Sequence, residues 1–249
     1  MNKYGLIGHH LSHSYSPLIH QYIFEKNNIN ATYELIEVEE FQLEDCVNNL
    51  KNNIYKGYNV TIPYKEKIMK FCDVLTDAAK EIGAVNTIYM KDGLVVGDNT
   101  DYLGFSAELK TYDIRVFGKD IYVLGSGGAS KAICYSIKQN GGNPVVVSTK
   151  GNGLSYQEFK EINHYDLIVN TTPVGMFPNV GESVIEQEYV LKADVCVDLI
   201  FNPPITKFLS YSKRGYNGLL MLIYQAIYAE ELWQNSKVDY DLEELLNSF

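Results

Sequence analysis

The chain has 249 residues, of which 46% are apolar and 21% charged, and its formal net charge is −10 at pH 7. This apolar fraction excludes a disordered chain, and the length allows one large domain or two smaller ones with complete cores. The negative charge argues against nucleic acid or an anionic membrane as the main partner. The amino terminus lacks the apolar run of a signal peptide, and no stretch approaches the roughly 20 apolar residues of a membrane span. We therefore expect a cytoplasmic protein.

The first hundred residues alternate short β-branched runs with amphipathic stretches, a pattern typical of α/β proteins. Ser16 and Pro17 open the first predicted helix, because serine is a favoured N-cap and proline fits the first helical position. Asp92 and Gly93 suit the tight turn of a hairpin. In this part of the chain we expect strands over residues 4–8, 32–38 and 57–62, helices over 16–26, 41–51 and 64–72, and a hairpin of residues 84–90 and 94–97.

A second α/β run begins near residue 120. The predicted fold class is therefore α/β with two lobes, an α/β lobe in residues 1–103 and a Rossmann-like dinucleotide-binding domain in residues 104–217. Periodicity alone does not decide which lobe the last helix packs against. In this second run we expect strands over residues 121–125, 144–149, 166–170 and 194–200, and helices after residue 126, over 203–214 and over 219–234.

A glycine-rich turn follows the first strand of the second run, and it opens a helix. Gly125 permits a tight turn, Gly127 lets a phosphate approach the backbone, and free amides at the helix start face the anion. The third position of the dinucleotide fingerprint is Ser130, where glycine or alanine is usual. A glycine cluster alone is also typical of an ordinary strand–helix turn, but the position between a strand and a helix favours a cofactor site.

The end of the next strand bears on the choice of cofactor. An NAD site places an acidic residue there, about 20 residues after the glycines, to bind the ribose 2′-hydroxyl. This strand ends in Ser148, Thr149 and Lys150, and the next acidic residue is Glu158. A lysine attracts a 2′-phosphate and a carboxylate repels it, so the sequence favours NADP. The alternative interpretation is that Lys150 is a solvated loop residue.

Three polar clusters lie between the apolar elements of the amino-terminal lobe. Residues 12–17 place two hydroxyls, Ser14 and Ser16, beside a helix start that suits a carboxylate, although Ser16 alone is more typical of an N-cap. Lys65 is predicted in the first turn of a helix, where the macrodipole lowers the pKa of a lysine toward proton transfer; the alternative is a solvated ammonium group. Residues 83–87 and 97–101 add side chains that commonly form turns. Together with Lys65, Asp101 would form a proton relay on one alcohol.

These motifs together resemble the shikimate dehydrogenase family, and their order and spacing hold over nearly the whole chain. Eight motifs in register are far more specific than one glycine loop. The motifs are HSYSP at 13–17, NVTIPYK at 59–65, GAVNT at 83–87, GDNTD at 97–101, GSGGAS at 125–130, NTTPVGM at 170–176, and the segments 198–206 and 218–226.

The resemblance implies a reversible, NADPH-dependent reduction of 3-dehydroshikimate to shikimate, a small-molecule step of aromatic amino acid biosynthesis. It implies that residues 218–249 return to the amino-terminal substrate-binding and catalytic lobe, and that Lys65 and Asp101 flank the reacting oxygen. Further substrate contacts are implied for Ser14 and Ser16 on the carboxylate and for Thr61, Asn86 and Gln225 on the hydroxyls. Cofactor contacts are implied for Asp77, Gly125, Ser126, Gly127, Gly128, Ala129, Ser148, Thr149, Lys150, Leu199 and Gly218.

The chain departs from the family pattern at two places. The arginine that usually grips the 2′-phosphate is absent from the segment 148–150, and Lys150 lacks the planar fork of an arginine. We therefore expect a weaker NADP preference and compatibility with NAD. Phe201 stands where a substrate-contacting tyrosine is common, a loss worth about 0.5–1.5 kcal/mol if one hydrogen bond is not replaced.

Other functions remain open at this point. A quinate or dual shikimate/quinate dehydrogenase using NAD or NADP shares the motifs, and a non-catalytic nucleotide-binding regulatory module is the alternative of another class. A folate dehydrogenase has less support, because a serine pair suits a small acid. The five histidines never form an HxxxH pair, so we expect no metal site. For assembly, the sequence leaves a monomer or a homodimer open.

Overall fold

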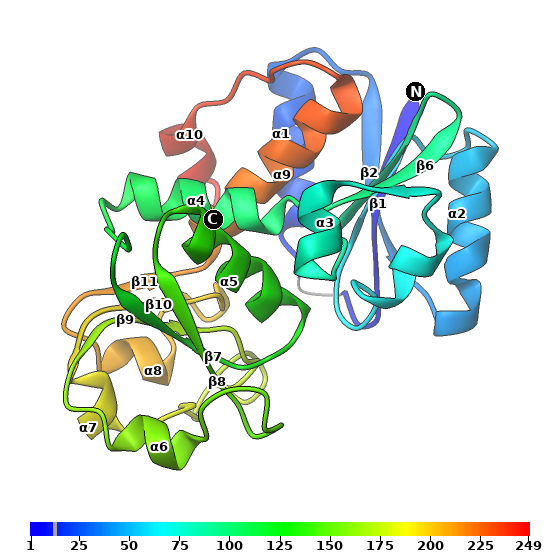
Figure 1. Ribbon diagram of the computed structural model, residues 1–249. Helices are drawn as coiled ribbons and strands as arrows, with labels where there is room; N and C mark the ends of the chain where they lie inside the picture. Colours follow the sequence, from blue (N-terminus) through cyan, green and yellow to red (C-terminus); the bar gives the residue numbers. More distant parts are fainter. Residues whose placement is uncertain (12–13) are drawn as a thin grey trace. The chain divides into compact units, whose positions relative to one another are not determined.

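The computed structural model describes residues 1–11 and 14–249; Ser12 and His13, part of the first polar cluster, lie outside the described residues. The chain divides into two compact units, each with its own sheet (Figure 1). Unit 1 comprises Met1–Thr100 and Ile223–Phe249, and unit 2 comprises Asp101–Leu222. The divisions lie a few residues from the expected limits at 103/104 and 217/218, one at the start of α4 (Asp101–Thr111) and one inside α9 (Leu219–Gln234).

Unit 1 is built on a six-stranded mixed sheet. Its strands are β1 (Asn2–Gly8), β2 (Ala31–Glu37), β3 (Gly57–Val60), β4 (Val74–Leu75), β5 (Thr87–Lys91) and β6 (Leu94–Asp98). Their order is β2-β1-β3-β5-β6-β4, with β2, β1 and β3 parallel and β5 antiparallel to both of its neighbours. In the β5–β6 turn, Asp92 and Gly93 have φ values of 52° and 77°, which confirms the predicted tight hairpin.

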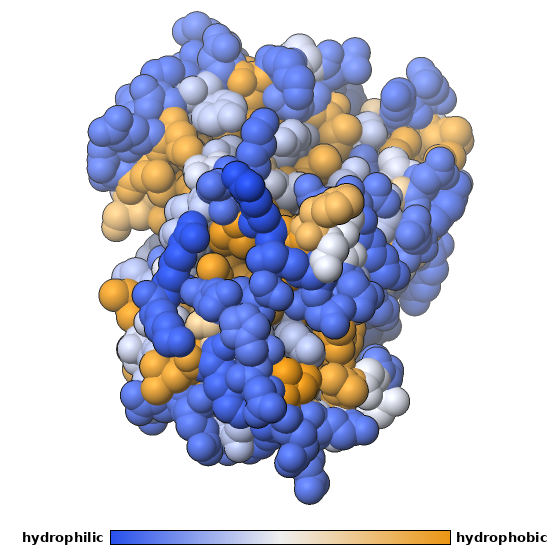
Figure 2. Space-filling model, turned by 60° about the vertical axis from the view of Figure 1, so that its left-hand side comes forward, coloured by the Kyte–Doolittle hydropathy of each residue, from blue (hydrophilic) through white to orange (hydrophobic). Residues whose placement is uncertain are grey.

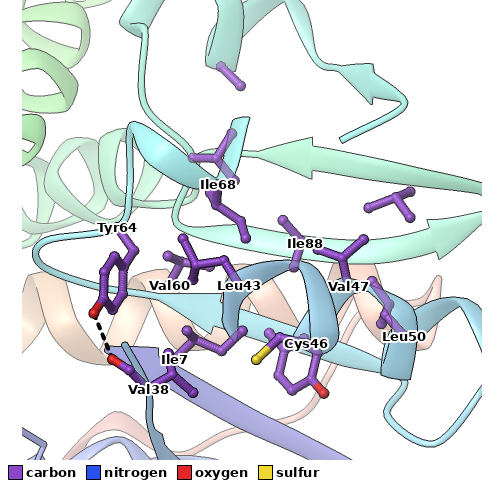
Figure 3. Packing of buried hydrophobic residues seen from close by; sticks show 14 residues of the cluster. Ile7, Val38, Leu43, Cys46, Val47, Leu50, Val60, Tyr64, Ile68 and Ile88 are labelled. Carbon is purple, nitrogen blue, oxygen red and sulfur yellow. Dashed lines mark hydrogen bonds between the residues drawn. The ribbon is translucent and has the colours of Figure 1, made fainter. Parts of the chain in front are cut away.

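Helices cover both faces of this sheet (Figure 1). Leu43, Val47 and Leu50 of α2 point into a core that also contains Ile7 of β1 and Val60 of β3 (Figure 3). From residue 223 onward α9 belongs to unit 1, so the carboxy-terminal segment returns to the amino-terminal lobe as expected. The helical elements of unit 1 are α1 (Ser16–Lys26), the 3₁₀ helix η1 (Glu40–Gln42), α2 (Leu43–Lys51), the 3₁₀ helix η2 (Lys67–Phe71), α3 (Asp77–Ile82), the later part of α9, and α10 (Leu242–Leu246).

Unit 2 contains a five-stranded sheet in which all strands are parallel. Its strands are β7 (Asp120–Leu124), β8 (Asn143–Val147), β9 (Tyr165–Asn170), β10 (Ala193–Asp198) and β11 (Gly215–Asn217), in the order β11-β10-β9-β7-β8. The chain goes from β7 to β8 on one side and then returns to β9 on the other. This reversal beside β7 is the topological switch point at which α/β sheets bind ligands.

The two faces of the parallel sheet are both covered, as such sheets require. Phe105 of α4 and Ile133 of α5 (Gly128–Gln139) lie in the core on one face. Phe159 of α6 (Tyr156–Lys160) and Phe208 of α8 (Lys207–Ser210) lie in a second core, together with residues of α7 (Gln187–Val190). A two-lobed α/β fold with a Rossmann-like sheet is thereby confirmed.

Two helix predictions were wrong. Residues 64–72 form turns and then the short 3₁₀ helix η2, because the Lys65 carbonyl accepts a hydrogen bond from Val85 N–H, outside any helix. Of the helix predicted over 203–214, only α8 exists. Pro203 and Pro204 keep the residue before each of them extended, and Thr206 caps the helix that follows. Short elements such as α3 and β11 were not predicted.

Among the described residues, no helix is both long and apolar enough to cross a bilayer. The face of the molecule in Figure 2 is mostly hydrophilic, with apolar residues in separate patches.

Candidate functional site

The amino end of α1 presents two serine hydroxyls with different roles. Ser14 Oγ accepts a hydrogen bond from Ser16 N–H at 3.2 Å, which leaves the Ser14 proton to donate elsewhere. Ser16 is buried, with 4% of its surface exposed. Tyr15 is the N-cap residue and Ser16 the first helical residue, so the prediction of Ser16 as N-cap was wrong. Ser14 instead accepts from an amide that the helix start would leave unpaired.

Asn59 and Asn86, one from each of the other two predicted clusters, meet inside unit 1. The register of the sheet pairs Asn59 of β3 with Thr87 of β5. Asn59 Nδ2 donates to Thr87 Oγ1 at 3.1 Å and to the Asn86 carbonyl at 3.3 Å, and its Oδ1 accepts from the Tyr33 hydroxyl at 2.8 Å. All four residues are buried, so this network is held in an environment where each hydrogen bond matters.

Asn86 is the centre of this network. Its Nδ2 donates to Thr100 Oγ1 at 3.0 Å and to Gln225 Oε1 at 3.2 Å, while its Oδ1 accepts from Thr100 N–H at 2.6 Å. Gln225 lies on α9 and is 139 residues away in the chain. The structure therefore brings two of the predicted substrate-binding residues, Asn86 and Gln225, into direct contact.

Lys65 lies in a loop with two backbone anchors. Tyr64 is buried, and its hydroxyl donates to the Val38 carbonyl at 2.6 Å (Figure 3), while Val85 N–H binds the Lys65 carbonyl at 2.8 Å. Lys65 precedes the 3₁₀ helix η2 and is not in the first turn of an α-helix. The prediction that a helix macrodipole acts on its ammonium group was therefore wrong. Thr61 is half-buried at the start of the same loop.

Two further predicted residues take contrasting positions. Asp101 is 5% exposed and is the first residue of α4, directly after the buried Thr100. Asp77 begins α3 on unit 1, is fully exposed, and lies 3.4 Å from the Lys80 ammonium group. The contact of Asp101 with Lys65, and that of Asp77 with a cofactor, stay predictions.

In unit 2 the glycine-rich turn has the shape that phosphate binding needs. Gly125 adopts a φ of 107°, which disfavours any residue with a side chain. Gly127 is the N-cap of the twelve-residue helix α5, and no side chain caps the first amides of that helix. A Cβ added at Gly127 would meet no atom within 4 Å, so the space beside this residue is open. The backbone here fits an anionic group such as a dinucleotide phosphate.

Ser130, the departure from the fingerprint, has a structural explanation. Its side chain is 2% exposed and donates to the Gly125 carbonyl at 2.7 Å. The hydroxyl therefore ties the start of α5 to the turn that it follows, which is the close packing that glycine or alanine provides in other fingerprints.

The segment after β8 is folded back on itself. Ser148 is buried, donates to Ser126 Oγ at 3.0 Å, and accepts from Lys150 N–H at 3.0 Å. Thr149 and Lys150 are exposed. Glu158, the first acidic residue beyond this strand, forms a capping box with Ser155 at the start of α6, and these hydrogen bonds lower the pKa of its carboxyl. The Glu158 carboxylate is thus engaged at the start of α6. The sequence between β8 and Glu158 contains no other acidic residue.

A buried carboxylate organises the ends of β9 and β10. Asp198 Oδ1 accepts from Asn170 Nδ2 at 3.0 Å and from Ile200 N–H at 3.1 Å, and Oδ2 accepts from Thr206 Oγ1 at 2.6 Å. Burial raises the pKa of Asp198 to about 6, although these hydrogen bonds lower it. The segment between Ile200 and Thr206, which includes Phe201, is therefore fixed at both ends.

Gly218 lies against the backbone of Leu199. A Cβ at Gly218 would overlap the Leu199 carbonyl, so only glycine permits this approach. The predicted pair of cofactor residues is thus in contact at the carboxyl edge of the sheet.

One group of metal-binding residue types occurs among the described residues, away from this edge. Single ligand atoms of His164, Asp166 and Asp194 lie within 4.8 Å of one another near the start of β9 and β10. Sequence spacing missed the group because its members come from two strands. The Lys119 ammonium group lies 2.7 Å from Asp166 and supplies its counter-charge.

The chain is similar to known proteins over nearly its whole length. A family model described as the shikimate dehydrogenase substrate binding domain matches residues 6–88. Shikimate dehydrogenase (NADP(+)) of Caldanaerobacter subterraneus is 41% identical over 96% of this chain and 93% of its own. The chain belongs to the shikimate dehydrogenase family.

Solved structures of shikimate dehydrogenases have the same fold. Shikimate dehydrogenase 1 of Peptoclostridium difficile is 39% identical, covers 99% of this chain and 96% of its own, and gives a TM-score of 0.90. The enzyme of Thermus thermophilus, solved with NADP(H) and shikimate, is 29% identical, covers 96% and 95%, and gives a TM-score of 0.88.

Sequence reasoning missed two members of the buried network, Tyr33 and Thr100. Tyr33 is an inward-facing position of a strand and looks like any core tyrosine. Thr100 was noted only as part of a motif. No pattern in the sequence distinguishes either residue, because their partners lie in distant segments.

Proposed function

We propose that the chain catalyses the reversible NADPH-dependent reduction of 3-dehydroshikimate to shikimate. The observation that carries the proposal is the identity of 41% to a shikimate dehydrogenase (NADP(+)) over 96% of the chain. The polar network of unit 1 and the open glycine turn of unit 2 supply the two kinds of binding group that this reaction needs.

On the substrate side, Ser14 and Ser16 hold the carboxylate. The Ser14 oxygen is used by Ser16 N–H, so its proton is directed to the ligand. Thr61, Asn86 and Gln225 bind the ring hydroxyls. Asn86 and Gln225 already bind each other, so their orientation is set before the substrate arrives, which lowers the entropy cost of reaching the reactive geometry.

Lys65 and Asp101 carry out the proton transfer. NADPH, when bound, supplies the hydride. Lys65 donates a proton to the substrate oxygen as negative charge develops there, and Asp101 orients the lysine and binds the neighbouring hydroxyl. The anchors at Tyr64 and Val85 hold the Lys65 loop, which limits the positions available to the ammonium group.

On the cofactor side, the amides after Gly127 bind the pyrophosphate, and residues 125–129 surround it. Lys150 attracts the 2′-phosphate of NADP as a single charge, and Ser148 and Thr149 add hydroxyls beside it. Because a lysine lacks the bidentate fork of an arginine, the preference for NADP over NAD is weaker than in relatives that have the arginine. Leu199 and Gly218 meet the nicotinamide end.

The test is a steady-state comparison of shikimate and quinate, each with NADP⁺ and NAD⁺, followed by the absorbance of the reduced nicotinamide. We expect the highest kcat/KM with shikimate and NADP⁺, and measurable activity with NAD⁺. No turnover with shikimate and either cofactor would contradict the proposal and favour a non-catalytic nucleotide-binding module.

The Phe201→Tyr variant tests whether the tyrosine hydroxyl that is common at this position in the family contributes to shikimate binding. If the missing tyrosine hydroxyl weakens shikimate binding, the variant lowers the KM for shikimate, by up to about tenfold for one hydrogen bond of about 0.5–1.5 kcal/mol. Equal kcat/KM values for quinate and shikimate in the unmodified protein would instead assign a dual shikimate/quinate activity.

Location in the cytoplasm and assembly as a monomer or homodimer stay predictions.

A further inference from the structure

A fully buried carboxylate lies at the end of β10, directly before the loop that leads to α8. Asp198 is the last residue of β10, and the register of the sheet pairs it with Asn170 at the end of β9. Thr206 caps α8, which packs beside β10 (Figure 1). None of these three residues is exposed. A neutral residue would avoid the cost of burying a charge, so packing alone does not explain the carboxylate.

The backbone fixes the direction of two hydrogen bonds to Asp198. Thr172 N–H donates to Asn170 Oδ1 at 3.0 Å, so Asn170 turns its Nδ2 hydrogens toward Asp198 Oδ1, 3.0 Å away. Leu209 N–H donates to Thr206 Oγ1 at 3.2 Å, so the Thr206 proton is directed to Asp198 Oδ2 at 2.6 Å. Both neighbouring side chains therefore present hydrogens to Asp198, which can only accept.

A third donor comes from the chain directly after β10. Ile200 N–H donates to Asp198 Oδ1 at 3.1 Å. Burial raises the pKa of Asp198 to about 6, so the carboxyl is ionised at pH 7 and accepts all three hydrogens. An amide of the same size has one acceptor oxygen and would turn its own hydrogens toward at least one of these donors. The arrangement therefore specifies an aspartate.

The same carboxylate closes the loop that follows it. Residues 199–205 belong to no helix or strand, so hydrogen bonds from outside the loop set its position. Oδ1 binds one end through Ile200 N–H, and Oδ2 binds the other end through Thr206, eight residues from Asp198. Asn217 adds one hydrogen bond in the middle of the loop. Loss of either bond to the carboxylate should therefore let the two ends separate.

Leu199, the first residue of this loop, is held on two sides. Its N–H donates to the Asn170 carbonyl at 3.0 Å. Gly218 packs so closely on Leu199 that a Cβ there would overlap the carbonyl oxygen, and Gly218 N–H donates to the Ile200 carbonyl at 3.4 Å. The bond from Ile200 to Asp198 thus also sets the position of Leu199 relative to Gly218.

We infer that Asp198 is a positioning residue for the nicotinamide end of the cofactor, acting through the loop 199–205. The inference rests on the proposed function, in which Leu199 and Gly218 meet that end. Asp198 is fully buried, so it acts by holding the loop and not by touching the cofactor. A positioning role accounts for the charged group on which three donors from separate segments converge.

The experiment compares two ligands in Thr206→Val, which keeps the shape of the side chain and removes its hydroxyl. One ligand is NADPH, and the other is adenosine 2′,5′-bisphosphate, which has the 2′-phosphate and a 5′-phosphate but no nicotinamide. We expect the Kd for NADPH, measured by titration calorimetry, to rise about fivefold or more, within the range of one lost hydrogen bond. The Kd for the bisphosphate should stay within about twofold, because the glycine turn and Lys150 are not altered. Equal changes for both ligands, or no change for NADPH, would overturn the inference.

Two control variants separate this effect from a loss of stability. Thr206→Ser keeps the hydroxyl and loses a buried methyl group, so its Tm should fall while both Kd values stay within about twofold of the unmodified protein. Val190→Ala makes a cavity before the start of β10, in the core that also contains Phe208 of α8, and should likewise lower only the Tm. A preferential loss of NADPH affinity in either control, equal to that in Thr206→Val, would overturn the inference.

Asp198→Asn tests the same connection even if Thr206→Val folds poorly. The amide should weaken NADPH binding and leave the Kd for the bisphosphate within about twofold, since one donor loses its acceptor. In Asp198→Asn/Thr206→Val, the Kd for NADPH should rise by less than the product of the two single effects, because both changes break one connection. An unchanged Kd for NADPH in Asp198→Asn, or a double variant that shows the full product, would overturn the inference.

Failure of the proposed function is distinguishable from failure of this inference. An unmodified protein that binds NADPH but does not oxidise shikimate would contradict the proposed reaction, while the Kd values of the two ligands in the variants would still decide the role of Asp198. An unmodified protein that does not bind NADPH would overturn both.

Discussion

In unit 1 the candidate site consists mainly of side chains that are hydrogen-bonded to one another. In unit 2 it consists mainly of backbone groups. In unit 1, the single side chain of Asn86 is hydrogen-bonded to both Thr100 and Gln225, which come from segments far apart in the chain. In unit 2, the turn at Gly125 and the unpaired amides at the start of α5 come from one continuous stretch.

The difference follows from the two sheets. All strands of unit 2 are parallel, so their carboxyl ends meet at one edge and the loops after them gather there. The sheet of unit 1 mixes both directions, and its polar residues meet across neighbouring strands, as Asn59 and Thr87 do. Substitutions at the glycine turn of unit 2 should therefore act locally and sterically, and those in unit 1 through networks.

The largest expected effect belongs to unit 1 and to Lys65. Lys65→Ala should lower kcat by about 10²–10⁴-fold, the usual contribution of a positioned general acid. Binding of NADPH, measured by the fluorescence of the reduced nicotinamide, should be nearly unchanged. A variant that retains most of its turnover would show that the proton comes from another group.

The corresponding test in unit 2 is Gly127→Ala. Its methyl group would enter open space and leave the apo protein as stable as before. In that space it would keep the phosphate from the amides, and we expect NADPH affinity to fall about tenfold or more, because hydrogen bonds to a charged group are lost. Gly181→Ala is the matched control, since a Cβ there also meets no atom within 4 Å. Equal affinities of the two variants would contradict a phosphate site at Gly127.

A stability effect without a role in catalysis is expected at Glu108 of α4. This carboxyl is fully buried with no hydrogen-bond partner among the described residues, and burial raises its pKa well above the usual value. Above pH about 4.5 the unfolded chain releases this proton while the folded protein keeps it, so stability falls as the pH rises toward the raised pKa. Glu108→Met should remove this fall and stabilise the protein at pH 8 by about 1–3 kcal/mol, the cost of an unsatisfied buried group. Thermal unfolding at pH 5 and pH 8 measures the difference; parallel pH dependence in both proteins would refute it.

The smallest expected effect is that of Asp77→Asn. Asp77 is fully exposed and contacts only Lys80 of its own helix among the interactions described for it. Its loss should leave the Tm unchanged and alter the KM for NADP⁺ by no more than about twofold, as for most exposed positions. A larger increase in the KM for NADP⁺ would place this residue near the cofactor.

Much of the architecture could be predicted because local chemistry determines it. The Asp92–Gly93 turn, the helix over 219–234 and the strand–glycine–helix unit at Gly125 all follow from residue types and spacing. The helix over 64–72 could not be predicted correctly, because Val85, distant in sequence, takes the carbonyl of Lys65. Periodicity contains no information on such a competitor.

The candidate site shows the same division. The glycine turn and the serine pair can be predicted from the sequence, whereas Tyr33 cannot, because its contacts are with Asn59 and His20, which lie in other segments of the chain. Ser130 departs from the fingerprint in sequence, but its hydroxyl ties the helix to the turn. Residues whose function depends on several distant partners leave no local pattern.

The path of α9 has a consequence for synthesis on the ribosome. Unit 2 ends at Leu222, while unit 1 needs the segment that follows. The lobe that is translated first is thus completed last, against the usual amino-terminal-first order of co-translational folding. Trp233, the only tryptophan, packs against Gly57 and Tyr4, so its fluorescence would mark the moment at which the nascent amino-terminal lobe closes.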